Sequence, residues 1–212
     1  MKLLAVSDEE VAWINSPRLS ERCADVDLVI SCGDLPNDYL EYIATTLNKP
    51  CYYVHGNHDT PPAQPDIVTG KLRKTDPEGW LNLDLQRARL DDLRLAGLEG
   101  CHRYKPNAPY QYSQSDQWLR AFWLARKLAQ GMARWGRGMD IMVTHAPLRD
   151  IHDGSDVAHH GFDAFNWLAK SFKPRLWLHG HQHRNYNPLQ GGDTRLGETR
   201  IVNVHPYRIL EF

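Results

Sequence analysis

Short apolar runs recur along most of the chain, and polar residues or glycines bound each of them. Runs of this length with turn signals at both ends are typical of strands that are buried on both faces. The pattern predicts such strands at residues 2–7, 27–32, 51–55, 140–144 and 175–179.

Helical periodicity occupies several of the stretches between these strands. Ser16 and Pro17 are suited to cap and begin a short helix. Residues 38–47, which follow Asn37, repeat apolar side chains at helical spacing, and residues 162–172 have a similar apolar face. The chain therefore alternates strands with helices, as layered α/β proteins do.

A longer helix is expected after residue 114, with Ser115 as its cap. Tryptophan carries a large apolar surface, so the tryptophans of the chain are expected in the core. Trp118, Trp123 and Trp167 are assigned to the core-facing sides of helices, and Trp177 is assigned to a strand.

The remaining segments have no helical pattern. Frequent Pro and Gly predict a surface loop at residues 60–79, whereas residues 81–97 alternate enough to indicate short strands or a hairpin. Residues 200–212 indicate a further strand. The sequence contains no repeat or linker, so we expect one domain of α/β (α+β) class over residues 1–212.

Charge and composition narrow the range of partners. The chain has 25 Lys and Arg against 26 Asp and Glu, which gives no electrostatic sign of binding to nucleic acid or to an anionic membrane. Its first apolar run is too short for a signal peptide or a membrane span, so the expected location is cytoplasmic. Cys32 and Cys51 lie in apolar runs and are expected as reduced core thiols.

Residues of types that can ligate metals come at or just after the ends of successive predicted strands. They are Asp8, Asp34, Asn57 with His58 and Asp59, His145, and finally His181 with His183. Ligands of such sheets bind outside the carboxyl ends of the strands, so these side chains are expected to meet in space. Carboxylate, amide and imidazole ligands without thiolate favour borderline divalent metals such as Mn, Fe and Zn.

Four short motifs carry a family resemblance. They are Gly33-Asp34, Gly56-Asn57-His58-Asp59, Thr144-His145 and Gly180-His181-Gln182-His183, in this order. Together they resemble the signature of the calcineurin-like metallophosphoesterase family. The resemblance implies a four-layer αββα sandwich of two mixed sheets with flanking helices. It also implies two divalent metal ions, and hydrolysis of phosphomonoesters or phosphodiesters by metal-activated hydroxide.

The resemblance also assigns roles to individual residues. Asp34 would bridge the two metals, and His58 would act as the catalytic acid. The remaining ligands would be Asp8 and His183 on one metal, and Asn57, His145 and His181 on the other.

One position departs from the family pattern. The first family motif is Asp-x-His, whereas this chain has Asp8-Glu9-Glu10. Glu10 would either replace the histidine as a carboxylate ligand, which suits the harder ions Mn and Mg, or point away and leave that metal site weak. The ligand chemistry alone leaves both alternatives open.

Single histidines are more often surface or core groups than ligands. This interpretation is applied to His102, His152, His159 and His205, which lie outside the four motifs. It is also favoured for His160, for which the alternative is a side chain that faces the pocket.

The substrate has no signature of its own. Protein Ser/Thr phosphatases usually have Asp-Arg-Gly after their Gly-Asp, whereas here Asp34 is followed by Leu35-Pro36-Asn37-Asp38, so a small phosphate ester is expected. Residues 60–79 and 152–162 are expected to line the pocket. The alternative function is a scaffold of the same fold or a regulatory metal-binding module without turnover; the retained ligands favour the enzyme. The oligomeric state is left open.

Overall fold

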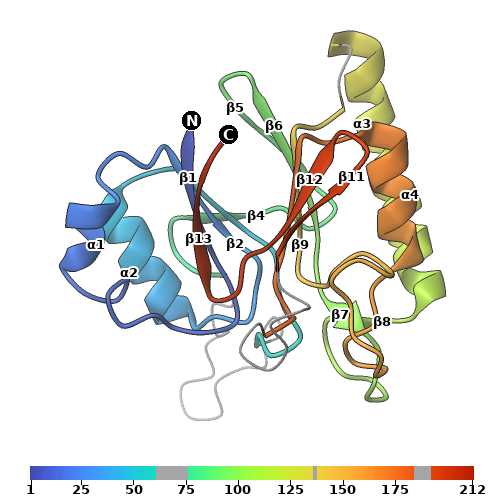
Figure 1. Ribbon diagram of the computed structural model, residues 1–212, viewed down its shortest axis with the longest axis horizontal. Helices are drawn as coiled ribbons and strands as arrows, with labels where there is room; N and C mark the ends of the chain where they lie inside the picture. The colour runs from blue at the N-terminus through green and yellow to red at the C-terminus, as the bar shows by residue number, and fades with distance from the viewer. Residues whose placement is uncertain (61–75, 136–137, 184–191) are drawn as a thin grey trace, which may run out of the picture.

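The computed structural model describes residues 1–60, 76–135, 138–183 and 192–212. Two mixed β-sheets pack face to face, and helices cover their outer faces (Figure 1). This is the four-layer α/β arrangement that the motifs imply. The loop expected at residues 60–79 lies mostly outside the described residues, and only its ends, residue 60 and residues 76–79, are described.

The first sheet has the strand order β13-β1-β2-β3-β4. Its strands are β1 (Lys2–Val6), β2 (Leu28–Ser31), β3 (Cys51–Tyr53), β4 (Trp80–Asn82) and β13 (Tyr207–Glu211). Strands β1 to β4 are parallel, and β13 pairs antiparallel with β1. Helices α1 (Arg18–Arg22) and α2 (Asn37–Leu47) cover its outer face (Figure 1).

The second sheet has the order β11-β12-β10-β9-β6-β5. Its strands are β5 (Arg87–Leu90), β6 (Leu93–Leu98), β9 (Ile141–Thr144), β10 (Leu176–His179), β11 (Asp193–Leu196) and β12 (Thr199–Asn203). The four inner strands are parallel, and β5 and β11 are antiparallel edges. Helices α3 (Gln114–Trp135) and α4 (Asp163–Phe172) cover it, and β7 (Cys101–His102) pairs with β8 (Gln111–Tyr112) nearby.

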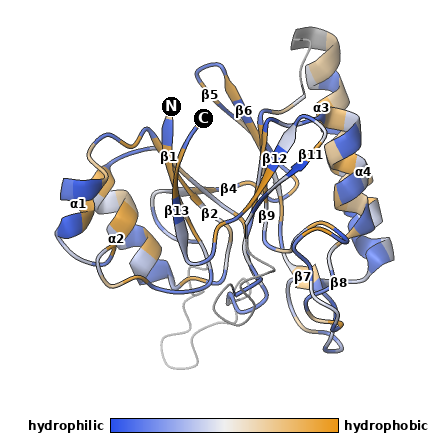
Figure 2. Ribbon diagram, viewed as in Figure 1, coloured by the Kyte–Doolittle hydropathy of each residue, from blue (hydrophilic) through white to orange (hydrophobic). Residues whose placement is uncertain are grey.

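Three apolar clusters fill the spaces between the four layers. The central cluster joins the inner faces of the two sheets through residues such as Leu3, Ile30, Val143 and Leu178. A second cluster joins α1 and α2 to the first sheet, and a third joins α3 and α4 to the second sheet. The apolar side of α2 that faces the sheet is visible in Figure 2. The continuous apolar runs of the sequence are therefore strands with a covered face on each side, as predicted.

The C-terminal segment differs from the prediction of one strand over residues 200–212. It forms two strands in different sheets, because β12 pairs with β10 while β13 pairs with β1. Pro206 lies between them and has no N–H to donate to a ladder, so the pairing stops there and the chain crosses to the other layer.

The N-terminal cap of α3 also differs from the prediction. The helix begins at Gln114, and Ser113, not Ser115, is the capping residue. The Ser113 Oγ accepts a hydrogen bond from the Asp116 N–H at 3.1 Å, and the Asp116 carboxylate accepts one from the Ser113 N–H at 2.9 Å. This reciprocal pair is a capping box, which the spacing Ser-x-x-Asp encodes.

The prediction that helical tryptophans lie in the core is wrong for two of them. Trp118 and Trp123 of α3 are 40% and 52% exposed. Trp167 of α4 is partly buried, and Trp177 of β10 is fully buried. Apolar residues occupy more of the circumference of α3 than the part that packs against the second sheet. Periodicity alone therefore does not tell which of these residues face the core. In the parts of the chain that the structure describes, no helix is both long enough and apolar enough to cross a membrane.

Candidate metal centre

The predicted ligands gather where the parallel strands of both sheets end. Asp8, Asp34 and Asn57 follow β1, β2 and β3 of the first sheet, and His145 and His181 follow β9 and β10 of the second. The site therefore lies across the seam between the two sheets, at the carboxyl edge where ligands of such sheets bind.

The backbone at this edge is turned sharply. Asp8, Asp34 and His181 have φ angles of 67°, 58° and 65°, in the left-handed region that costs energy for residues with a side chain. Gly56 approaches the site so closely that a Cβ there would collide with the Asp34 carboxylate. Backbone strain of this kind is retained where the surrounding structure fixes a functional geometry.

The tightest part of the site surrounds one imidazole nitrogen. His145 Nε2 lies 3.0 Å from Asn57 Oδ1, 3.1 Å from His181 Nδ1 and 3.3 Å from Asp34 Oδ2. The candidate ligand atoms of Asp34, His145 and His181 all lie within 4.8 Å of one another. Two imidazoles, one carboxylate and one amide oxygen thus converge, a donor set that fits a borderline divalent metal.

Both imidazoles are fixed from behind. His145 Nδ1 lies 2.7 Å from the carbonyl oxygen of Cys32, and His181 Nε2 lies 2.8 Å from that of Ala158. Each of these nitrogens donates its proton to a carbonyl, which leaves the other ring nitrogen of each side chain facing the cluster. Metal-binding histidines are oriented in this way by backbone acceptors.

The amide of Asn57 is oriented by an aromatic hydroxyl. Asn57 Nδ2 donates a hydrogen bond to the Tyr104 hydroxyl at 3.2 Å, so Oδ1 is the atom that faces His145. Nothing in the sequence near Tyr104 signals this contact, because the two residues are 47 positions apart.

Charge in the cluster is balanced by a proton. Burial raises the pKa of Asp34, but the charge and hydrogen bond of His145 outweigh this effect and lower that pKa to about 2. Burial lowers the pKa of His145, but the charge of Asp34 outweighs it and raises that pKa to about 9. Burial and the charge of His145 lower the pKa of His181 to about 3, so its imidazole is neutral. A carboxylate held ionised beside a proton that can leave is an arrangement suited to a cation.

The other predicted metal position is more open. Both carboxylate oxygens of Asp8 accept from the His181 N–H at 3.0 Å, and burial raises the pKa of this acid. The His183 Nε2 lies 3.8 Å from the Asp8 carboxylate, and its side chain is 41% exposed. Asp8 and His183 therefore lie near each other as predicted, although His183 is less enclosed than His145 and His181.

Glu10 is exposed. The next residue, Val11, donates its N–H to the Tyr39 hydroxyl of α2 at 3.3 Å, so this part of the chain lies beside α2. Burial, with a smaller contribution from the charge of Glu10, raises the pKa of Tyr39 to about 12. The neighbouring Glu9 instead lies 3.5 Å from His205 Nε2.

Two histidines outside the four motifs, which the sequence assigned to the surface or core, lie against the predicted ligands. The His205 ring stacks on His183 with centroids 4.5 Å apart, and the His159 ring lies 5.0 Å from His181. His205 lies two residues after the end of β12, so its position near a strand end is the sequence signal that could have indicated it. His159 belongs to residues 152–162, and this segment lies beside the site, since the His159 carbonyl also accepts from Gln182 Nε2 at 2.9 Å.

The residues of the Gly56-Asn57-His58-Asp59 motif make different contacts. The His58 side chain is exposed, while its N–H donates to Asp34 Oδ1 at 2.7 Å. Asp59 Oδ2 accepts from the Gly56 N–H at 2.8 Å and the Asp34 N–H at 3.2 Å, which ties the two turns together. The imidazole of His58 is therefore free to face a bound molecule while its backbone holds Asp34.

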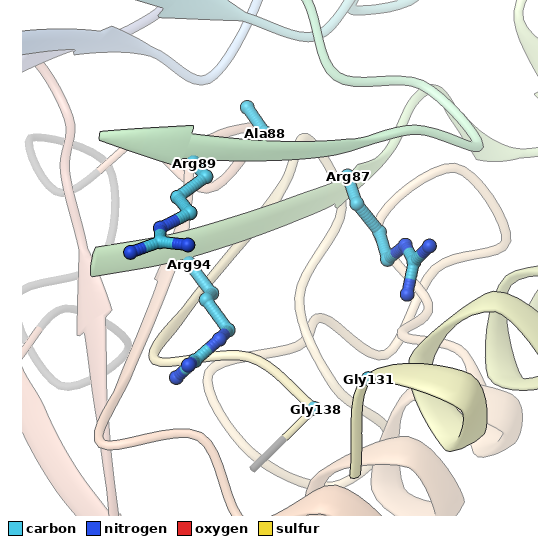
Figure 3. A pocket seen from close by; sticks show the side chains of 6 residues that line it. All are labelled: Arg87, Ala88, Arg89, Arg94, Gly131 and Gly138. Carbon is cyan, nitrogen blue, oxygen red and sulfur yellow. The ribbon is translucent and has the colours of Figure 1, made fainter. Parts of the chain in front are cut away.

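A cavity of about 200 Å³ lies elsewhere in the molecule. It is lined by Arg87, Ala88, Arg89, Arg94, Gly131 and Gly138, and Figure 3 shows the three arginines on one side of the β5–β6 hairpin. This hairpin turns before β6, so it lies at the opposite end of the second sheet from His145. Arg89 and Arg94 have acidic partners at 3.5 Å in Asp92 and 3.9 Å in Asp140. The cavity is therefore separate from the metal centre.

Residues 1–185 match the calcineurin-like phosphoesterase family, and the chain belongs to it. Two crystal structures show the same fold. One, which carries no protein name, covers 99% of this chain and 94% of its own, with a TM-score of 0.64 and 17% identity. The other, TT1561 of Thermus thermophilus, covers 96% of this chain and 88% of its own, with a TM-score of 0.59 and 15% identity. No curated protein matches the sequence.

Proposed function

We propose that this protein is a metal-dependent hydrolase of small phosphate monoesters or diesters. The observation that carries the proposal is the convergence of Asn57, His181 and Asp34 on His145 Nε2, at 3.0 to 3.3 Å. Membership of the phosphoesterase family gives this donor set its reaction class. A protein Ser/Thr phosphatase is a weaker interpretation, because Leu35-Pro36-Asn37-Asp38 follows Gly33-Asp34 where those enzymes have Asp-Arg-Gly.

We infer two metal positions, which differ in how far their ligands are buried. Asn57, His145 and His181 would hold one cation and share Asp34 with a second, held by Asp8 and His183. The first set is buried, with both imidazoles fixed by carbonyls, whereas His183 is exposed. Mn, Fe and Zn suit these donors. When bound, such cations stabilise charge on phosphoryl oxygens and lower the pKa of coordinated water.

The chain's own residues supply orientation and a proton. The Cys32 and Ala158 carbonyls and the Tyr104 hydroxyl hold the ligands so that little rearrangement is needed when substrate binds. His58 presents an exposed imidazole beside Asp34, where it can donate a proton to the departing oxygen.

Metal removal tests the proposed function directly. Protein stripped with a chelator is expected to lose hydrolysis of bis-p-nitrophenyl phosphate and of p-nitrophenyl phosphate, and to recover it when Mn is added. The ratio of the two rates then indicates whether diesters or monoesters are preferred. Absence of turnover with every metal tried, in protein shown to have bound it, would favour the non-catalytic scaffold or regulatory module.

Replacing His58 with Ala is expected to lower kcat by about 10²–10⁴-fold for an ester with a poor leaving group. The metal-to-protein ratio should be unchanged, because His58 holds Asp34 Oδ1 through its backbone N–H, which alanine keeps. The loss should be smaller for p-nitrophenyl phosphate than for phenyl phosphate, since p-nitrophenolate leaves without much help from an acid. Equal losses for both esters would remove His58 from the role of proton donor.

A further inference from the structure

The outer side of α3 is an apolar surface. Trp118, Leu119, Phe122, Trp123 and Met132 are 40%, 60%, 54%, 52% and 41% exposed. We call these five residues the outer patch. Arg126 is the one charged residue among the exposed positions between 117 and 133. Its guanidinium lies 5.4 Å from the centre of the Trp123 ring, so it covers part of the patch and brings one positive charge to it.

The opposite side of the same helix is already used. Leu124 and Leu128 are fully buried against the second sheet. Helix α3 is therefore apolar on two sides, and a helix of this kind is normally covered all round. Single exposed apolar residues are common on protein surfaces, but a contiguous group of large ones marks a site of contact.

The patch continues onto α4. The Trp118 ring lies 5.6 Å from the ring of Trp167, which in turn lies 6.5 Å from Phe172. Helices α3 and α4 form the outermost layer over the second sheet (Figure 1). The apolar surface is thus carried by two packed helices, so it has a fixed shape and little conformational entropy to lose on contact.

We propose that the outer patch binds a second copy of this chain, with the α3 helices packed against each other around a twofold axis. Interface cores are rich in Trp, Phe, Met and Arg and poor in Lys, Asp and Glu. The exposed side of α3 has this composition. In a twofold interface, the same patch supplies both surfaces, so a patch made mostly of apolar side chains is complementary to itself.

The area of the patch agrees with this arrangement. Its large side chains are each about half exposed, so together they present roughly 400–500 Å² of apolar surface. A standard interface buries about 800 Å² on each partner. The patch therefore supplies the apolar centre, and the polar residues around it, such as Ser115 and Gln130, would supply part of the rim.

A membrane surface fits the patch less well. Helices that lie on anionic membranes have a polar side with many Lys and Arg residues, which provide much of the attraction. The exposed positions of α3 from 117 to 133 offer Arg126 alone, and the whole chain has a formal net charge of −1. Charge therefore favours a second copy over a lipid headgroup layer.

The experiment is sedimentation velocity of the full chain from about 1 to 100 µM. The wild-type protein is expected to move from monomer to dimer over this range. Phe122→Glu is expected to raise the dimer dissociation constant by about 100-fold or more, because each substitution of a central residue enters a twofold interface twice. Position 122 is half exposed, so the variant should keep its circular dichroism spectrum and its metal content.

Leu81→Glu is the matched control. Leu81 is another large, exposed apolar residue, 62% exposed, but it lies on β4 of the first sheet. Its variant should form dimers like the wild type. A wild-type protein that stays monomeric at 100 µM would overturn the proposal, and so would a Phe122→Glu variant with unchanged dimerisation. If the monomer instead sedimented with phosphatidylserine vesicles in a manner that Phe122→Glu abolished, the patch would be a membrane contact.

Discussion

Asp34→Asn is expected to lower kcat/KM for bis-p-nitrophenyl phosphate by at least about 10³-fold and to reduce the bound metal per chain. Asp34 is the carboxylate closest to His145 Nε2, and its ionised form is held by that imidazole, with a pKa of about 2. Asparagine has the same shape and can still accept the hydrogen bond of the His58 N–H, so the fold should remain. Initial rates and elemental analysis of the purified variant provide the two measurements.

Two variants complete this test. Asp38→Asn makes the same chemical change four positions away, at an exposed position in the first turn of α2, and should leave both quantities unchanged. Glu10→Ala should also keep the wild-type ratio of metal to protein, because Glu10 is exposed and adjoins Val11, whose N–H contacts Tyr39. Full turnover with a full metal complement in Asp34→Asn would contradict the proposed centre. Loss of metal-induced thermal stabilisation without loss of turnover would point to a regulatory metal.

Trp177→Ala is expected to lower the free energy of unfolding by about 3–5 kcal/mol. Trp177 is fully buried in β10, where its ring lies 5.6 Å from Phe165 and its Nε1 donates to Thr144 Oγ1 at 2.9 Å. Alanine would leave a cavity between α4 and the second sheet and a buried hydroxyl with one partner fewer. Urea unfolding of metal-free protein, followed by circular dichroism, measures the change.

The comparison variant for this measurement is Leu81→Ala, which removes an exposed apolar side chain from β4. It should change the free energy of unfolding by less than about 0.5 kcal/mol. If Trp177→Ala cost as little, the packing between α4 and β10 would contribute far less to stability than its burial indicates.

The strands and most of the candidate site could be predicted from the sequence. Apolar runs such as those before Asp34 and His145 are buried on both faces, and that requirement leaves a clear pattern. The placement of ligands at strand ends then follows from the geometry of parallel sheets, and the structure brings Asp34, Asn57 and His145 together as expected.

Other features left no usable pattern. The carbonyls of Cys32 and Ala158 that hold the imidazoles belong to the backbone, and any residue at those positions could supply them. Tyr104 reaches Asn57 from a distant part of the chain. Trp118 and Trp123 are wrongly assigned to the core because an apolar side of a helix looks the same in sequence whether it meets the sheet or another molecule.

The position of the candidate metal centre between the two sheets has a mechanical consequence. Asp34 and Asn57 are carried by the first sheet and His145 and His181 by the second, so a cation held by all four would rivet the two layers together. Any slip of one sheet over the other would change the spacing of the ligands. If a cation binds there, the side chains that hold the two sheets in register, such as Ile30 and Val143, would help to set its affinity although they would not contact it. The apolar packing between the sheets would thus act on the candidate metal centre through the spacing of its ligands.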